Sequence, residues 1–214
     1  VSSGEFRSDH AVRFAMTYKN DSDLSLKLKS VQKFISLGHD LLPLENQGIY
    51  VYSNVSENEK LAFCFPGQGT HYISMGRFLY DSNQTFKDVI NEVNALAKSQ
   101  MDFDLVAHIY GETGNSEIEK RLGTLTGAQV SLFAVELGLA KVLEEKGIIP
   151  DVLIGHSFGE ISALTFAGVW DIPTAFKAVK ARIEAAEFAK NSCSFPLGMM
   201  SIVCSEEKRD RLLN

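Results

Sequence analysis

Two short apolar runs that end in glycine-rich turns constrain the fold of this chain most strongly. Residues 61–65 are apolar throughout and run into Pro-Gly-Gln-Gly at 66–69. Residues 151–154 form a second short run, which leads into Gly-His-Ser-Phe-Gly at 155–159. Such runs are typical of buried strands in a parallel sheet, and glycine-rich turns often follow them. The sequence therefore predicts an α/β fold built on parallel strands.

Helical patterns fill the space around these two runs. A long helix is predicted from Gly127 to Lys146, where Gly147 and Pro150 end it. Strands that alternate with helices predict a parallel sheet with helices on both faces. The other expected elements are helices at about 74–80, 83–99, 104–109, 160–167 and 174–190, and a strand at 197–203.

The first sixty residues differ from the rest. Strands are predicted at 12–17 and 48–53, and the apolar spacing between them predicts an amphipathic helix over 23–37. Polar residues 54–60 read as a linker. We therefore expect a small β-α-β unit over 1–59, a core over 60–196, and the start of a further subdomain over 197–214.

Composition favours a folded protein and excludes some classes. Hydrophobic residues make up 45% of the chain, and the net charge of -6 argues against a nucleic-acid partner. The cysteines are Cys64, Cys193 and Cys204, and their odd number and irregular spacing fit neither a disulfide framework nor a zinc site. Reduced cysteines predict a cytoplasmic protein, and we expect no metal.

No membrane segment is expected, because no apolar stretch approaches the roughly 20 residues that span a bilayer. Residues 1–10 are polar and lack the apolar region of a signal peptide. The chain starts without methionine and stops in what reads as a helix at 211–214. The sequence therefore suggests a piece of a longer chain.

Residues 155–159 match G-x-S-x-G, and this pattern gains meaning from its place between a strand and a helix. There Ser157 is a candidate nucleophile, and the N–H of Phe158 points at a developing oxyanion. Because both glycine turns end at the same sheet edge, Gln68 is a candidate second oxyanion donor. Taken alone, each motif is also compatible with an ordinary turn, and residues 67–69 with a phosphate-binding turn, although the P-loop pattern is missing.

The two motifs together, Phe-Pro-Gly-Gln-Gly-Thr at 65–70 and Gly-His-Ser-Phe-Gly-Glu at 155–160, resemble the malonyl-CoA:acyl-carrier-protein transacylase family. That family includes the acyltransferase domains of polyketide and fatty-acid megasynthases. The resemblance runs from about residue 60 to the end and implies an α/β-hydrolase-like core. It also implies roles for six residues: Ser157 is acylated, Gln68 and Phe158 form the oxyanion hole, Arg182 binds the carboxylate of the acyl group, Gln129 lies near the acyl site, and His156 forms part of the site wall.

The resemblance further implies partners. The substrates are an acyl-CoA and the phosphopantetheine thiol of an acyl carrier protein, with no metal or redox cofactor. The first sixty residues resemble the end of the linker that joins a ketosynthase to an acyltransferase, which implies a ketosynthase domain as a neighbour. Residues 197–203 resemble the first strand of an inserted ferredoxin-like subdomain.

The sequence departs from this family in three places. The family places its catalytic histidine after the inserted subdomain, so we expect that base to lie beyond this chain. His71 stands where glutamine is more common, and Ile183 stands where a glycine usually follows the arginine. The sequence leaves two alternatives open: an α/β-hydrolase-type serine esterase or thioesterase, and an inert scaffold fragment of a synthase that lacks its base.

Overall fold

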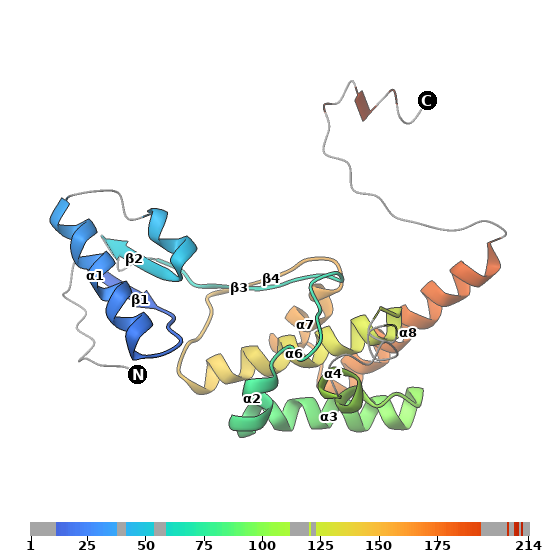
Figure 1. Ribbon diagram of the computed structural model, residues 1–214. Coiled ribbons are helices and arrows are strands. Elements are labelled where there is room, and N and C mark those ends of the chain that lie inside the picture. Colours follow the sequence, from blue (N-terminus) through green and yellow to red (C-terminus); the bar gives the residue numbers. More distant parts are fainter. Residues whose placement is uncertain are drawn as a thin grey trace. The chain divides into compact units, whose positions relative to one another are not determined.

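The chain folds into two units, Val1–Glu59 and Lys60–Asn214, in a computed structural model (Figure 1). The structure describes residues 12–37, 42–53, 59–111, 120, 123–193, 205, 208, 209 and 211. The strand predicted at 197–203 and the boundary predicted at 196/197 lie outside these residues. Each unit is described below by itself.

The first unit is a two-stranded antiparallel sheet covered by a helix. Strand β1 (Val12–Met16) pairs with β2 (Ile49–Ser53), and α1 (Asp21–Leu37) and a 3-10 helix, η1 (Leu42–Gln47), lie between them in the sequence. Its small core is formed by Val31, Leu44 and Ile49. The predicted strands and helix are confirmed within two residues, while the 3-10 helix was not predicted.

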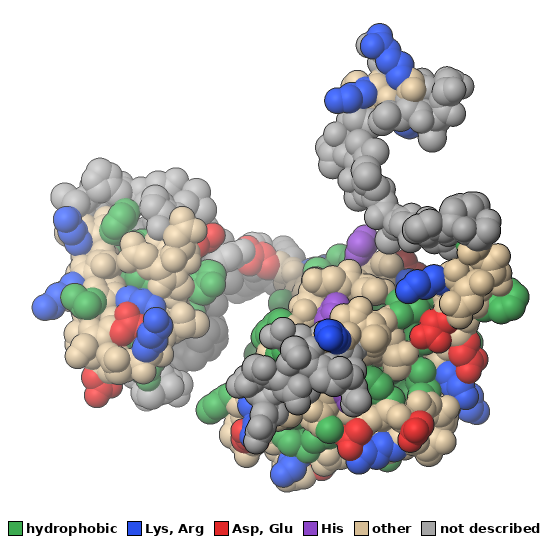
Figure 2. Space-filling model, turned by 45° about the vertical axis from the view of Figure 1, so that its right-hand side comes forward, with side chains coloured by type: hydrophobic (Ala, Val, Ile, Leu, Met, Phe, Trp, Pro, Cys, Tyr) green, Lys and Arg blue, Asp and Glu red, His purple; other side chains and the backbone are tan. Residues whose placement is uncertain are grey.

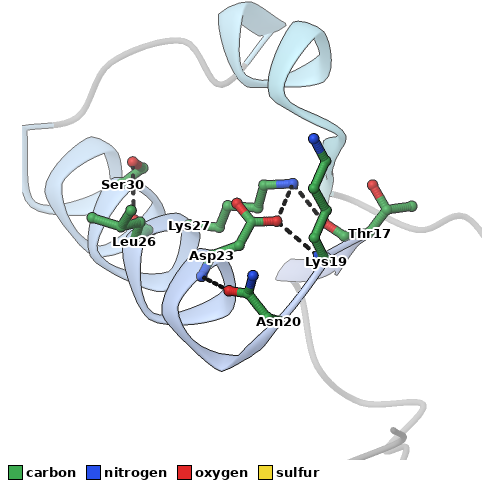
Figure 3. A network of polar contacts seen from close by, with 7 residues as sticks. All are labelled: Thr17, Lys19, Asn20, Asp23, Leu26, Lys27 and Ser30. Atoms are coloured by element: carbon green, nitrogen blue, oxygen red, sulfur yellow. Dashed lines mark hydrogen bonds and ion pairs between the residues drawn. The ribbon is translucent and has the colours of Figure 1, made fainter.

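A polar network fixes the start of α1 to the strand before it (Figure 3). The Lys27 ammonium donates to the carbonyl oxygen of Thr17 at 2.6 Å and lies 3.4 Å from the Asp23 carboxylate. Asp23 also accepts the N–H of Lys19, and Asn20 accepts the N–H of Asp23. The N–H of Asp23 is one of the donors that the first turn of a helix leaves free, and Asn20 satisfies it. The other bonds connect α1 to the residues between β1 and the helix.

The second unit contains a parallel strand pair surrounded by helices. β3 (Ala62–Phe65) pairs with β4 (Val152–Gly155), in register from Ala62 opposite Val152 to Phe65 opposite Gly155. The parallel pairing, and most of the helix bounds to within two or three residues, agree with the expectation from sequence. The helices are α2 (Arg77–Ser82), α3 (Gln84–Met101), α4 (Leu105–Tyr110), α6 (Leu125–Glu145), α7 (Gly159–Phe166) and α8 (Ile172–Ser192).

Helix α6 forms the centre of the second unit. It is apolar on most sides, packs on α3, α4, α7 and α8, and contributes Val130, Phe133 and Leu137 to the main core. Among the helices that the structure describes, α6 is the one that is long and apolar enough to cross a membrane by length and composition, so the expectation that no stretch approaches this length is wrong. However, 78% of its most apolar window is buried inside the unit, as expected for the core helix of a globular domain.

The two faces of the β3–β4 pair differ. Phe63, Phe65 and Leu153 on one face pack against α6 and α7, which lie below the strands in Figure 1. Among the described residues no helix covers the other face, where Val152 and Ile154 are 43% and 50% exposed. The expectation of helices on both faces is thus met on one face only. Figure 2 shows acidic and basic side chains interspersed on the surface in view.

Candidate active site

Ser157 occupies a strained position between β4 and α7. Its φ is +54°, a left-handed conformation that serine rarely adopts and that costs about 1–2 kcal/mol. The strand ends at Gly155 and the helix begins at Gly159, so the chain reverses within three residues. This geometry is the one expected of a nucleophile elbow, and Ser157 is exposed there.

The two flanking glycines are required by close backbone approach. A Cβ added to Gly155 would lie 2.4 Å from the Cα of Glu160, and one added to Gly159 would lie 2.1 Å from the carbonyl oxygen of Phe65. Both contacts are to main-chain atoms, which cannot rotate away. A side chain at either position would therefore push the elbow away from the helix or from β3.

The two glycine-rich turns lie against each other. The N–H of His156 donates to the carbonyl oxygen of Phe65 at 3.0 Å, which continues the parallel pairing past the end of β4. A Cβ on Gly67 would lie 3.3 Å from the Cβ of Ser157. The turn at 66–69 thus reaches the nucleophile candidate, although 90 residues separate the two in sequence.

Two backbone donors in the two glycine-rich turns are free among the described residues. The N–H groups of Phe158, the residue after Ser157, and of Gln68, the residue after Gly67, donate to no protein acceptor there. The side chain of Phe158 is fully buried in the core, so the position of this residue is fixed. Free N–H groups on fixed backbone are the donors that stabilise an oxyanion in acyl transfer.

Arg182 reaches the elbow from α8. Its Nη2 donates to Ser157 Oγ at 3.5 Å, and its guanidinium carbon lies 6.0 Å from the centre of the Phe158 ring. Asp171 caps α8 by accepting the N–H of Thr174 at 2.8 Å, and Ile183 is buried in the core. The isoleucine that departs from the family pattern therefore anchors the helix and leaves Arg182 exposed over the serine.

Gln129 holds the turn that carries Gln68. It lies early in α6, is 1% exposed, and its Nε2 donates to the Gln68 side-chain oxygen at 3.4 Å. Its own side-chain oxygen has no partner among the described residues. The sequence suggested only that Gln129 lies near the site, and the structure adds this contact with Gln68.

Histidines do not contact Ser157 Oγ in the part of the chain that the structure describes, where Arg182 makes its only hydrogen bond. His156 is exposed, and its ring lies 3.1 Å from the position of a Cβ on Gly67. His71 is half-buried with no partner for Nδ1, and His108 stacks on Phe103. His10 and His39 lie outside the described residues.

The sequence analysis did not single out the buried acid Glu136. Glu136 on α6 is 7% exposed, and burial raises its pKa to about 7, although the nearby Ser162 hydroxyl lowers it. No hydrogen bond of normal geometry joins these two side chains. The sequence signal for it was a single acidic residue within the apolar stretch of the long helix. No group of acidic, histidine or cysteine side chains placed to hold a metal ion occurs among the described residues.

The parallel strand pair and the helices packed on it place the chain among α/β proteins, and Ser157 lies in the turn between a strand and a helix. Residues 62–200 match the family described as Acyl transferase domain, which is well over half of the chain. The chain belongs to the acyl transferase domain family.

Individual relatives agree with this assignment. The chain is 32% identical over 136 residues to the polyketide biosynthesis acyltransferase homolog PksD of Bacillus subtilis (strain 168), covering 64% of this chain and 40% of that protein. It is similar to the acyltransferase domain from the second module of the salinomycin polyketide synthase, with 30% identity and a TM-score of 0.59, over 82% of this chain and 38% of that one.

A third similar structure is an acyl carrier protein S-malonyltransferase from Vibrio cholerae O1 biovar eltor. The identity is 32% and the TM-score 0.52, over 61% of this chain and 40% of that one. The chain therefore spans about two fifths of the length of the proteins it resembles.

Proposed function

We propose that this chain carries the nucleophile of an acyltransferase that moves a malonyl-type group from coenzyme A to an acyl carrier protein through an acyl-Ser157 intermediate. The observation that supports the proposal most is the strained Ser157, with the Arg182 guanidinium at 3.5 Å from its Oγ and the turn at 66–69 against it. The names of the Vibrio cholerae and Bacillus subtilis relatives support the same reaction class.

In the first half-reaction, Ser157 Oγ attacks the thioester carbonyl carbon of the acyl-CoA. The N–H groups of Gln68 and Phe158 stabilise the oxyanion, each contributing about 3 kcal/mol in comparable sites. The C–S bond then breaks, coenzyme A leaves as the thiol, and the acyl group stays on Ser157 as an ester. Gln129 positions the first of these donors through the Gln68 side chain.

The second half-reaction reverses these steps with another thiol. The phosphopantetheine thiol of the carrier protein attacks the ester carbonyl, a thioester forms, and the Ser157 hydroxyl is restored. No metal or redox group takes part in this scheme. Both half-reactions need a general base, which the family resemblance places in a later segment of the domain.

Arg182 selects the acyl group in this proposal. A planar guanidinium binds a carboxylate through two parallel hydrogen bonds, and Arg182 lies within reach of the acylated oxygen. A malonyl group carries a free carboxylate, whereas a simple ester or acetyl group does not. This contact favours acyl transfer from a carboxylated donor over the hydrolase alternative.

Several finer features belong to the same proposal. The core is of the α/β-hydrolase type, and residues 197–214 begin a ferredoxin-like insertion. The first unit is the end of a linker from a ketosynthase domain, and the protein acts in the cytoplasm. The short parallel pair supports the assignment of the core, and the division of the chain at residue 59 supports a separate linker unit.

Peptide mass spectrometry after incubation with malonyl-CoA tests the proposal. We expect one malonyl group, attached to Ser157, to accumulate slowly and to accumulate faster when imidazole is added as an external base. The Ser157→Ala variant is the matched control and should carry no label. If wild-type chain with imidazole carries no acyl group on Ser157, the proposed function is wrong.

A further inference from the structure

Two buried polar side chains face each other where the central helix α6 packs on α7, the helix that follows Ser157. Glu136 of α6 is 7% exposed, and Ser162 of α7 is fully buried. They lie close enough for the Ser162 hydroxyl to lower the pKa of the Glu136 carboxyl. Neither side chain has a hydrogen bond of normal geometry to another described residue. Both are therefore available to each other as partners across the helix interface.

No opposite charge balances Glu136 within the described part of the chain. Burial raises its pKa, Ser162 lowers it, and no ionised group acts on it. The buried faces of α3 and α8 are apolar, and α4 brings His108, which stacks on a phenylalanine ring. The other titratable side chains that line the groove of about 400 Å³ beside Glu136 are Cys64 and Tyr72. In such surroundings the protonated carboxyl is tolerated, whereas the carboxylate is costly.

Helix α7 rests on the core through small side chains. It has eight residues, and those that are buried are Gly159, Ser162, Ala163 and Thr165. Its larger apolar side chains are partly buried or exposed. The Thr165 hydroxyl donates within the helix to the carbonyl oxygen of Ile161, which leaves the Ser162 hydroxyl for α6. Because α7 begins two residues after Ser157, a shift of this helix moves the candidate nucleophile.

We propose that Glu136 is a positioning residue for Ser157, and that its protonated carboxyl, hydrogen-bonded to Ser162, holds α7 and the elbow in the geometry that accepts the acyl group. Above neutral pH the proton passes to solvent, and the carboxylate turns from α7 toward water in the groove. Helix α7 then loses its polar contact with α6, and Ser157 leaves its place beside Arg182. This role rests on the proposed function, because acylation of Ser157 is the event that it controls.

The pH range of this change follows from the surroundings of Glu136. Burial raises its pKa to about 7, so the protonated form prevails below neutral pH and the carboxylate above it. The capacity of Ser157 to take an acyl group should therefore fall as pH rises through about 7. A glutamine at this position stays neutral and keeps a donor and an acceptor for Ser162, so it should preserve that capacity at high pH.

The first test is the rate of Ser157 acylation by malonyl-CoA with imidazole present, from about pH 5.5 to 9, for the full chain and its Glu136→Gln variant. Both proteins meet the same imidazole and thioester at each pH, so the ratio of their rates isolates Glu136. We expect the ratio of variant to parent to be near one at about pH 5.5 and about tenfold higher above pH 8. Trp170 fluorescence checks that both are folded at each pH. A ratio that is constant across this range would overturn the inference.

The second test removes the partner. Because Ser162 lowers the pKa of Glu136, Ser162→Ala should move the midpoint of the pH-dependent ratio, measured against the same variant carrying Glu136→Gln, to higher pH. Thr165→Ala is the matched control, since it removes a buried hydroxyl of α7 that bonds within the helix, and it should leave the midpoint in place. A midpoint that stays in place in Ser162→Ala, or moves equally in both variants, would contradict the pairing of Glu136 with Ser162.

Hydrogen exchange supplies a readout that needs no catalysis. At about pH 8, the amides of α7 should exchange several times faster in the parent than in Glu136→Gln, while the amides of α3, which report unfolding of the whole unit, should differ less. Equal exchange of α7 in the two proteins would overturn the inference even if Ser157 is acylated. If Ser157 takes no acyl group at any pH, the proposed function fails, and the exchange of α7 still decides whether Glu136 holds this helix.

Discussion

Ser157 stores conformational strain, and this strain has a measurable cost. Its φ of +54° is open to glycine without penalty but costs other residues about 1–2 kcal/mol. A strained residue at the end of a strand indicates that the placement of its side chain is retained at a cost in the free energy of unfolding.

We predict that Ser157→Gly unfolds at higher urea concentration than Ser157→Ala, by about 1 kcal/mol in the free energy of unfolding, because alanine keeps the strain and glycine relieves it. The single tryptophan, Trp170, packs on the main core of the second unit and reports its unfolding by fluorescence. Equal stability of the two variants would show that the elbow is unstrained.

Gly159 is the second residue on which the elbow depends. We predict that Gly159→Ala destabilises the second unit by about 3 kcal/mol, because its Cβ would overlap the carbonyl oxygen of Phe65. Gly147→Ala is the matched control. Gly147 has a positive φ of 77° and open space around its Cβ, so alanine there costs only the backbone strain of about 1 kcal/mol. Urea titration followed by Trp170 fluorescence separates the two, and similar losses would rule out the overlap.

Helices and strands that depend on local sequence patterns were predicted correctly. The apolar runs at 61–65 and 151–154 predicted β3 and β4, and the glycines after them predicted the turns at 66–69 and 155–159. The 3-10 helix at 42–47 was missed, because the burial of Leu44 that stabilises it is a tertiary contact. Among the described residues one face of β3 and β4 has no helix on it, and the sequence did not predict this because apolar strands look alike whether one face or two are covered.

The candidate site residues that lie within the two glycine-rich motifs could be predicted from the sequence. Ser157, Gln68 and Phe158 follow from glycine patterns, whereas the place of Arg182 over the serine depends on the path of α8, which Ile183 and the Asp171 cap fix. The contact of Gln129 with the turn at 66–69 depends on packing between distant elements, which one sequence does not encode locally.

The buried Glu136 on α6 makes the stability of the second unit depend on pH. Burial raises the pKa of Glu136 to about 7 from 4.5, so the folded chain holds a proton there that the unfolded chain has already lost. The stability of the second unit should therefore fall as pH rises from about 4.5 to 7 and then level off, with a total change of up to about 3 kcal/mol from this group.

We predict that Glu136→Gln removes this component. The variant should match the parent near pH 4.5 and be more stable above pH 7, because the amide stays neutral throughout. Urea unfolding at a series of pH values, followed by Trp170 fluorescence, gives the comparison. A constant difference between variant and parent across this range would mean that Glu136 does not titrate between pH 4.5 and 7.

For the whole molecule, the two units have separate cores. The first has its own cluster around Val31, Leu44 and Ile49, and the second is built around α6. We predict that a chain of residues 60–214 has a free energy of unfolding, followed by Trp170 fluorescence, within about 0.5 kcal/mol of that of the second unit in the full chain. The reason is that regions with separate cores contribute additively to stability. A larger shift in the urea midpoint would show that the units stabilise each other.

The central claim is that Ser157 takes an acyl group whose free carboxylate is held by Arg182. Its most direct test is the rate of Ser157 acylation by malonyl-CoA and by acetyl-CoA, with imidazole present, for the parent chain and for Arg182→Ala. We predict that the parent prefers malonyl-CoA and that the variant loses about tenfold or more of this preference while still reacting with acetyl-CoA. An unchanged preference in Arg182→Ala, or acylation at a residue other than Ser157, would contradict the account.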